Sequence, residues 1–163
     1  MAALSTWAAT VLSGSVTIND ASNLAVSISV RNDGERVWTA ADRVHIGTAE
    51  PRDSSSPLAH PAWLSPNRAV TFLERAVPPG AVATFEFPVA MPQGPAVSAL
   101  FEIVVEGACW LPNTTFSVTV RGHGASPLKV ALRALQQRRG VVARTCRRAV
   151  PTRARRWLAR LAG

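Results

Sequence analysis

Side chains able to act as catalytic bases, nucleophiles or metal ligands are few in this 163-residue chain, and they are scattered. His45, His60 and His123 show neither an i, i+4 spacing nor the HExxH pattern of a zinc site. Ser54, Ser55 and Ser56 form a polar run after an aspartate, which is typical of a turn, and the chain has no G-x-S-x-G elbow. These patterns do not indicate nucleophilic catalysis.

The cysteines and glutamates do not indicate catalysis either. Cys109 and Cys146 are far apart and form no CxxC pair, so we expect free thiols, no thiolate metal site and a reducing compartment. Glu102 and Glu106 extend from a predicted strand into the turn after it, where surface carboxylates are ordinary. The sequence therefore predicts a protein that is not an enzyme and that holds no metal and no cofactor.

A long connection, Gly47–Val70, has no helix or strand period and yet carries a tryptophan and two arginines. Long connections of this kind in compact domains are functional or disordered, and a disordered linker rarely keeps Trp. We expect Trp63 to fold back under the loop, with Trp38 and Trp110 as neighbours. Arg68 is the expected cation–π partner of an indole.

The exposed stretch of this connection, DSSSPLAHP, is the candidate recognition surface. Arg52 and Asp53 are adjacent and are expected to fasten the loop by hydrogen bonds. Loss of Leu58 and His60 is expected to affect binding alone. The candidate partner-binding residues are Arg52, Asp53, Leu58, His60 and Arg68.

The charge of the chain is divided unevenly. Residues 1–124 hold seven basic and ten acidic side chains, for a formal charge of −3, whereas residues 125–163 hold eleven basic and no acidic side chains. The total of +8 therefore combines a mildly acidic body with a strongly cationic tail. Such an asymmetry is typical of a tail that meets polyanions or an anionic membrane.

The tail has a helical period: Leu128, Leu132, Leu135 and Val142 lie near one stripe, with Arg on the remaining faces. This interleaving favours a membrane interface over nonspecific binding of nucleic-acid phosphates, and docking on the protein's own body is a further alternative. The candidate contact residues are Arg138, Arg139, Arg144, Arg147, Arg148, Arg153, Arg155, Arg156, Trp157, Leu158, Arg160 and Leu161.

The body consists of short segments that alternate between apolar and polar residues and are separated by Gly, Pro and Asn-Asp-Gly turns. The clearest is NLAVSISV, where every second residue from Leu24 is a large aliphatic. Phe85, Phe87 and Phe101 occupy equivalent positions in later segments and complete the predicted core with Trp38, Trp63 and Trp110. About seven such segments predict an all-β antiparallel sandwich over residues 1–121, a linker at 122–127 and the helical tail at 128–163.

Five short motifs occur in order along the body: RNDGERVW, IGTAEPRDSS, AWLSPNRA, VPPGAVATFEF and VVEGACW. Together they resemble the four-tryptophan domain, an immunoglobulin-like family found in selective autophagy receptors such as the next-to-breast-cancer-gene receptor and in many bacterial proteins. The resemblance covers roughly residues 7 to 120 and implies a noncatalytic domain that recognises a protein or glycan partner. An accessory module of an enzyme encoded elsewhere is the alternative for this body. Trp38, Trp63 and Trp110 match three of the family's tryptophans, with Trp7 as a candidate for the fourth.

The N-terminal stretch MAALSTWAATVLSGSV has no cationic region, and Ser, Thr and Gly interrupt its apolar residues, so it is a poor signal peptide. No apolar run is long enough for a spanning helix. The expected location is the cytoplasm, with peripheral association with a membrane surface through the tail.

Overall fold

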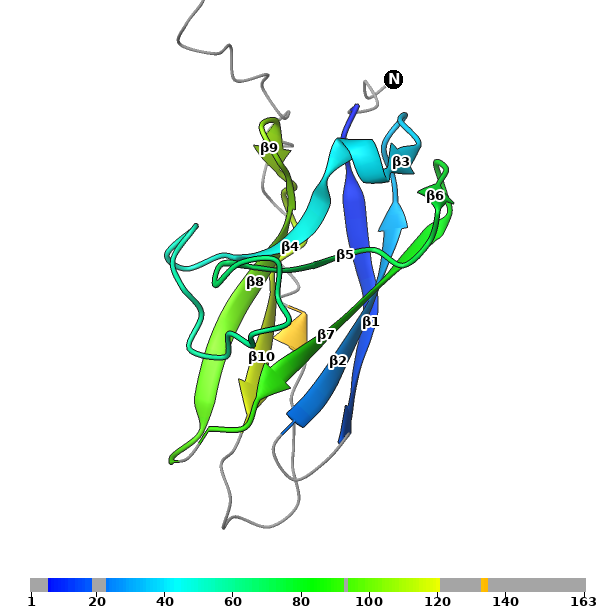
Figure 1. Ribbon diagram of the computed structural model, residues 1–163. Coiled ribbons are helices and arrows are strands. Elements are labelled where there is room, and N and C mark those ends of the chain that lie inside the picture. Colours follow the sequence, from blue (N-terminus) through cyan, green and yellow to red (C-terminus); the bar gives the residue numbers. More distant parts are fainter. Residues whose placement is uncertain (1–5, 19–22, 93, 121–132, 135–163) are drawn as a thin grey trace, which may run out of the picture.

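The computed structural model describes residues 6–18, 23–92, 94–120 and 133–134 (Figure 1). The regular secondary structure of these residues is almost entirely β-strand, and their one helical segment is the short 3-10 turn η1 at Ala40–Asp42. The strands are β1 Ala9–Ile18, β2 Asn23–Asn32, β3 Trp38–Thr39, β4 Val44–Thr48, β5 Arg68–Thr71, β6 Ala76–Val77, β7 Val82–Ala90, β8 Val97–Val105, β9 Cys109–Trp110, β10 Phe116–Val120 and β11 Arg133–Ala134.

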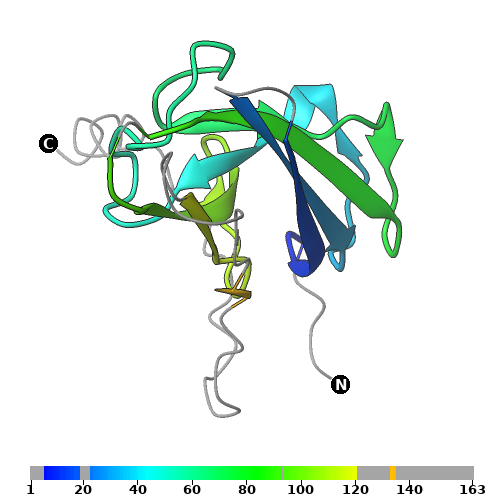
Figure 2. The ribbon, with the colours of Figure 1, turned by 90° about the horizontal axis from the view of Figure 1, so that it is seen from below.

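The strands form two main antiparallel sheets. One has the order β1-β2-β7, and the other has the order β11-β10-β8-β4-β5, with β9 also paired to β8. In Figure 2 the blue strands β1 and β2 lie on one side of the molecule and the yellow-green strands β8 and β10 on the other. The small pair β3-β6 and the loop between β4 and β5 lie at opposite ends (Figures 1 and 2). The prediction of antiparallel β-structure in the body is thus confirmed.

Alternation along each strand explains why these residues form sheets with one apolar face. In β2 the side chains of Leu24, Val26, Ile28 and Val30 are buried, whereas the intervening residues are half-buried. The same alternation holds in β7 and β10. Each sheet must therefore cover its apolar face, and the two sheets do so by packing against each other.

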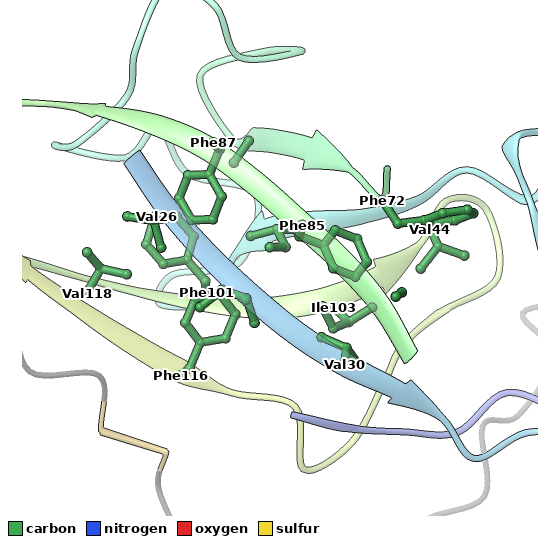
Figure 3. Close-up of a cluster of buried hydrophobic side chains, with 14 of the residues drawn as sticks. Val26, Val30, Val44, Phe72, Phe85, Phe87, Phe101, Ile103, Phe116 and Val118 are labelled. Carbon is green, nitrogen blue, oxygen red and sulfur yellow. The ribbon is translucent and has the colours of Figure 1, made fainter. Parts of the chain in front are cut away.

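The shared core is rich in aromatic rings that bridge the sheets (Figure 3). Phe87 of β7 and Phe101 of β8 meet with ring centroids 5.7 Å apart, and Phe101 stacks on Phe116 of β10 at 5.6 Å. Towards the β3-β6 end, Phe72 contacts Trp38 at 6.3 Å and Phe85 at 6.1 Å. Because such contacts join strands distant in sequence, they fix how the two sheets face each other.

Buried Asn32, the last residue of β2, holds the β3-β6 end in place. Its side-chain amide donates to the carbonyl oxygens of Arg36 and Val77, and its Oδ1 accepts from Gly34 N–H. All the polar groups of this amide thus have partners, which is what full burial requires. Gly34 is needed here because a Cβ would lie 2.7 Å from the carbonyl oxygen of Thr6.

Some local features of the strands are not contained in the alternation pattern. The segment AVTFLERAV divides into β5 and β6, because Leu73 N–H bonds to Thr84 O and the Glu74 carboxylate accepts from Thr84 N–H. The chain thereby leaves the edge of one sheet and joins the edge of the other. The one irregularity in the register of β1 with β2 lies at Leu12, between Val11 and Ser13. Strand β9 was not predicted.

Within the predicted helical tail, the structure describes Arg133 and Ala134. They form strand β11, paired with Phe116 and Ser117 of β10, so the helix prediction is wrong for these two residues. The open edge of β10 supplies backbone groups that an extended segment can bond, which explains the strand. The other tail residues of the prediction lie outside the described residues.

Candidate binding surface

The loop between β4 and β5, Ala49–Asn67, is anchored by Trp63. Its indole is buried, and Nε1–H donates to the carbonyl oxygen of Pro88 at 2.6 Å. The ring meets Phe87 and Phe101 edge-on, with centroids 5.9 and 6.0 Å apart. Trp63 therefore joins the loop to both sheets, as a large aromatic with one polar atom can do.

Leu58 and Ser56 also lie underneath the loop. Leu58 is fully buried in the core cluster, and its backbone N–H bonds to the Ser56 hydroxyl. The prediction that Leu58 belongs to an exposed recognition surface is therefore wrong. The polar run around it suggested exposure, but the loop folds over and places this single aliphatic side chain inside. Removing Leu58 would cost stability and would not report on binding alone.

On the outer face of the β4-β8 sheet, two arginines lie against the indole of Trp110. Strand β9 places Trp110 opposite Val104 of β8, where its side chain is half-buried. The guanidinium carbons of Arg52 and Arg68 each lie 5.1 Å from an indole ring centroid, within cation–π range. The indole also lies against Gly47 of β4, where a Cβ would come 2.8 Å from its Cη2 atom. Glycine at this position therefore leaves room for the ring.

Carboxylates complete this cluster of Trp110, Arg52 and Arg68, which is called the Trp110 cluster. Arg52 Nη2 donates to Glu102 Oε2 at 2.8 Å, and Arg68 donates to both Asp53 and Glu106. Arg68 is only 13% exposed, whereas the side chains of Arg52 and Asp53 are 53% and 56% exposed. Arg68 thus acts as an internal clamp, and Arg52 and Asp53 form the outer rim.

The ion pairs and their burial perturb the two titratable groups at the base of the cluster. Burial alone would raise the pKa of Glu106, but the hydrogen bond and charge of Arg68, aided by His45, lower it overall. Burial lowers the pKa of His45, and Glu106 opposes this only in part. The His45 Nδ1 atom lies 3.5 Å from Glu106 Oε1 and has no hydrogen-bond partner among the described residues. Burial therefore disfavours the protonated form of His45.

The structure separates the three tryptophans that the sequence grouped together. Trp38 is fully buried at the β3-β6 end, Trp63 packs on phenylalanines, and Trp110 lies outside the buried cluster. The indole under the Arg68 guanidinium is that of Trp110, not that of Trp63. Arg52 and Asp53 do fasten the loop, through Glu102 and Arg68. Phe85, Phe87 and Phe101 are buried.

His60 and Leu64 lie at the outer part of the loop. The His60 ring accepts from Ala62 N–H and is half-buried. Leu64 is 57% exposed and was not selected from the sequence, although it follows the anchoring Trp63 directly. Glu102 was similarly read as an ordinary surface group and is buried beneath Arg52.

The candidate membrane or polyanion contacts in residues 138–161 lie outside the described residues. Cys109 is disulfide-bonded in the structure, so the expectation of a free thiol is wrong for this residue. No helix among the described residues has the length and apolar character needed to cross a bilayer. In the same residues, His, Cys, Asp and Glu side chains form no group of three or more that would suit a metal ion.

Comparison with known proteins finds no matching family model, no matching curated protein and no matching solved structure.

Proposed function

We propose that the chain is a noncatalytic binding module whose loop Ala49–Asn67 recognises a protein partner, and whose cationic tail associates with an anionic membrane surface. The observation that carries the proposal is the construction of this loop. A buried indole, two arginine–carboxylate pairs and a cation–π cluster hold an irregular segment against a rigid sheet. Binding residues are commonly presented in this way, on loops that a scaffold positions.

The strand order supports an immunoglobulin-like architecture for the scaffold. Strands β1, β2 and β7 correspond to A, B and E of that fold, and β10, β8, β4 and β5 to G, F, C and C′. The resemblance of the body to four-tryptophan domains, which carry no catalytic residues, agrees with this assignment. Domains of this architecture serve many partners, so the partner is argued from the loop itself.

The exposed rim of the loop favours a partner with a carboxylate and an apolar side chain. Arg52 uses Nε and Nη2 on Glu102, which leaves other guanidinium N–H groups free to donate. A partner carboxylate can therefore bind Arg52 without breaking its internal ion pair. Leu64 adds an exposed apolar contact on the same loop. A protein surface supplies both groups together, whereas a glycan that stacks on Trp110 would compete with the arginines already on that ring.

The proposal is tested by affinity capture of photo-crosslinked partners with the full chain and four single variants. Arg52→Ala and Leu64→Ser should each reduce capture of the same protein at least about fivefold, as rim contacts of roughly 1 kcal/mol do. Arg75→Ala and Leu73→Ser are the matched controls, because Arg75 is exposed outside the loop and Leu73 is 60% exposed. Equal capture by all four variants, with melting temperatures unchanged, would refute recognition through this loop.

The membrane part of the proposal rests on the tail composition, eleven basic residues with interleaved Trp and Leu. Each cationic side chain near an anionic leaflet contributes on the order of 1 kcal/mol. Flotation of the full chain with vesicles containing phosphatidylserine should recover the protein, and neutral vesicles should not. Tight binding to RNA without flotation would instead support the nucleic-acid alternative.

A further inference from the structure

The edge strands of the two main sheets differ in how well they are protected from pairing with another chain. On β7, the outward edge is occupied by the segment that follows the loop. Thr84 C=O accepts from Leu73 N–H, Thr84 N–H donates to the Glu74 carboxylate, and Pro88 C=O accepts from the Trp63 indole. Pro88 has no N–H to offer. A further strand therefore cannot pair along β7 without displacing these groups.

The edges of the other sheet are also limited. Strand β10 already pairs with β11 at Phe116 and Ser117. Strand β5 has only four residues, and both backbone groups of Arg68 are bonded to Ser65. Short strands and occupied backbone groups are the usual means by which sheet edges avoid pairing with other chains.

Strand β1 lacks most of these means of protection. It is ten residues long, contains no charged residue and no proline, and pairs with β2 on one side. In the part of the chain that the structure describes, no strand pairs with its other side. Residues Leu12–Ser15 are exposed, and the bulge at Leu12 is the one irregularity in the register of β1 with β2. A long uncharged edge of this kind is a template for strand addition.

The sequence of β1 is also complementary to itself. In an antiparallel pair centred on Gly14, Ser13 lies opposite Ser15 of the second strand. Leu12 has no opposite residue in the register with β2. If it is likewise left unpaired here, Val11 lies opposite Val16 of the second strand, and Thr10 lies opposite Thr17.

The faces agree as well as the residue types. Val11 and Val16 pair with the core-facing Val30 and Val26 of β2, so both members of that pair lie on the core side. Ser13 and Ser15 pair with Ser29 and Ser27 and lie on the outer side of the sheet. A two-fold pairing therefore places apolar against apolar and hydroxyl against hydroxyl, which is the match that stabilises cross-strand neighbours.

We propose that β1 pairs antiparallel with β1 of a second copy of this chain, about a two-fold axis at Gly14, so that two three-stranded sheets become one six-stranded sheet. A single strand pair buries less surface than a stable obligate dimer, so the association is weak and depends on concentration. This inference does not depend on the proposed function, because it uses the sheet edge opposite the one that the loop covers.

The test uses the full chain and two double variants in sedimentation-velocity experiments, from about 10 µM to about 1 mM. Ser13→Lys with Ser15→Lys places like charges directly opposite each other across the axis. Ser13→Lys with Ser15→Glu changes the same two exposed positions but places Lys opposite Glu twice. Each variant is first compared with the parent chain by thermal melting to establish that it is folded.

The parent chain should show monomer–dimer exchange, the double-lysine variant should be monomeric over the same range, and the Lys–Glu variant should dimerise. The dissociation constants of the two variants should differ at least about tenfold, since opposite-charge pairs stabilise and like-charge pairs destabilise neighbouring strands. A monomeric parent chain at all concentrations would overturn the proposal. So would equal dimerisation of both variants, because the contact would then lie elsewhere.

Discussion

Replacement of Trp63 by alanine is expected to destabilise the whole domain and not only the loop that carries this residue. The indole is 7% exposed, meets two core phenylalanines edge-on and donates one hydrogen bond to Pro88. Truncation of a buried large aromatic costs about 3–5 kcal/mol, because the transfer free energy is lost and a cavity remains. The contact with Phe87 and Phe101 means that this cost falls on both sheets.

The measurement is urea unfolding followed by far-UV circular dichroism, since tryptophan fluorescence would change with the substitution itself. The free energy of unfolding should fall by about 3–5 kcal/mol, with the melting temperature lowered by more than about 10 °C. Trp63→Phe should cost less, about 1–2 kcal/mol, because a ring remains while the bond to the Pro88 carbonyl is lost. A larger loss of unfolding free energy for Trp63→Ala than for Trp63→Phe would separate the contribution of ring packing from that of the hydrogen bond.

The control is Leu64→Ala, a neighbouring substitution of an exposed side chain. It should change the free energy of unfolding by no more than about 0.5 kcal/mol, as surface substitutions usually do. If Trp63→Ala destabilised the protein no more than Leu64→Ala, the loop would not be anchored through the indole, and the argument for a rigid recognition loop would fail with it.

Three further predictions concern individual groups. The free energy of unfolding should fall as the pH drops below about 6.5, because burial lowers the pKa of His45 and the folded state binds a proton less readily than the unfolded chain. In urea titrations at several pH values, His45→Gln should lack the part of the pH dependence that His45 contributes. Gly47→Ala should destabilise the domain by about 1–3 kcal/mol through the clash with the Trp110 ring, and the cost should shrink in a Trp110→Ala background in a double-mutant cycle. Asn32→Ala should cost about 2–3 kcal/mol in chemical denaturation, because the buried Val77 carbonyl, the part-buried Arg36 carbonyl and the Gly34 N–H lose their partner.

The strands could be predicted from the sequence because alternation is a local property. Leu24 to Val30 in β2 and Phe116 to Val120 in β10 each bury every second residue, and the period alone shows which face must be covered. The end of β2 could also be predicted, since Asn-Asp-Gly is a turn signal. The alternation along a strand does not show which other strand it pairs with. The sequence therefore did not predict the short strand β9 or the division into β5 and β6.

The candidate surface was predicted only in part. The sequence drew attention to the loop that carries Arg52, Asp53 and Trp63, because a tryptophan and an Arg-Asp pair are unusual in an irregular segment. It could not place them, because the clamp joins Arg68 to Glu106, 38 residues further on, and Arg52 to Glu102, 50 residues further on. Exposure in a loop also has no period, so Leu58 and Leu64 could not be assigned to inside and outside.

The sequence by itself determined that the body is built of half-buried strands, that its long loop carries anchoring residue types, and that its positive charge is concentrated in the tail. These follow from composition and from spacing along the chain. Tertiary structure alone decided that Trp63 enters the core while Trp110 lies outside it against the guanidiniums of Arg52 and Arg68, and that no described strand pairs with the outer edge of β1. The physical reason is that burial and ion pairing depend on which segments meet in space, and those meetings are set by sheet order over tens of residues.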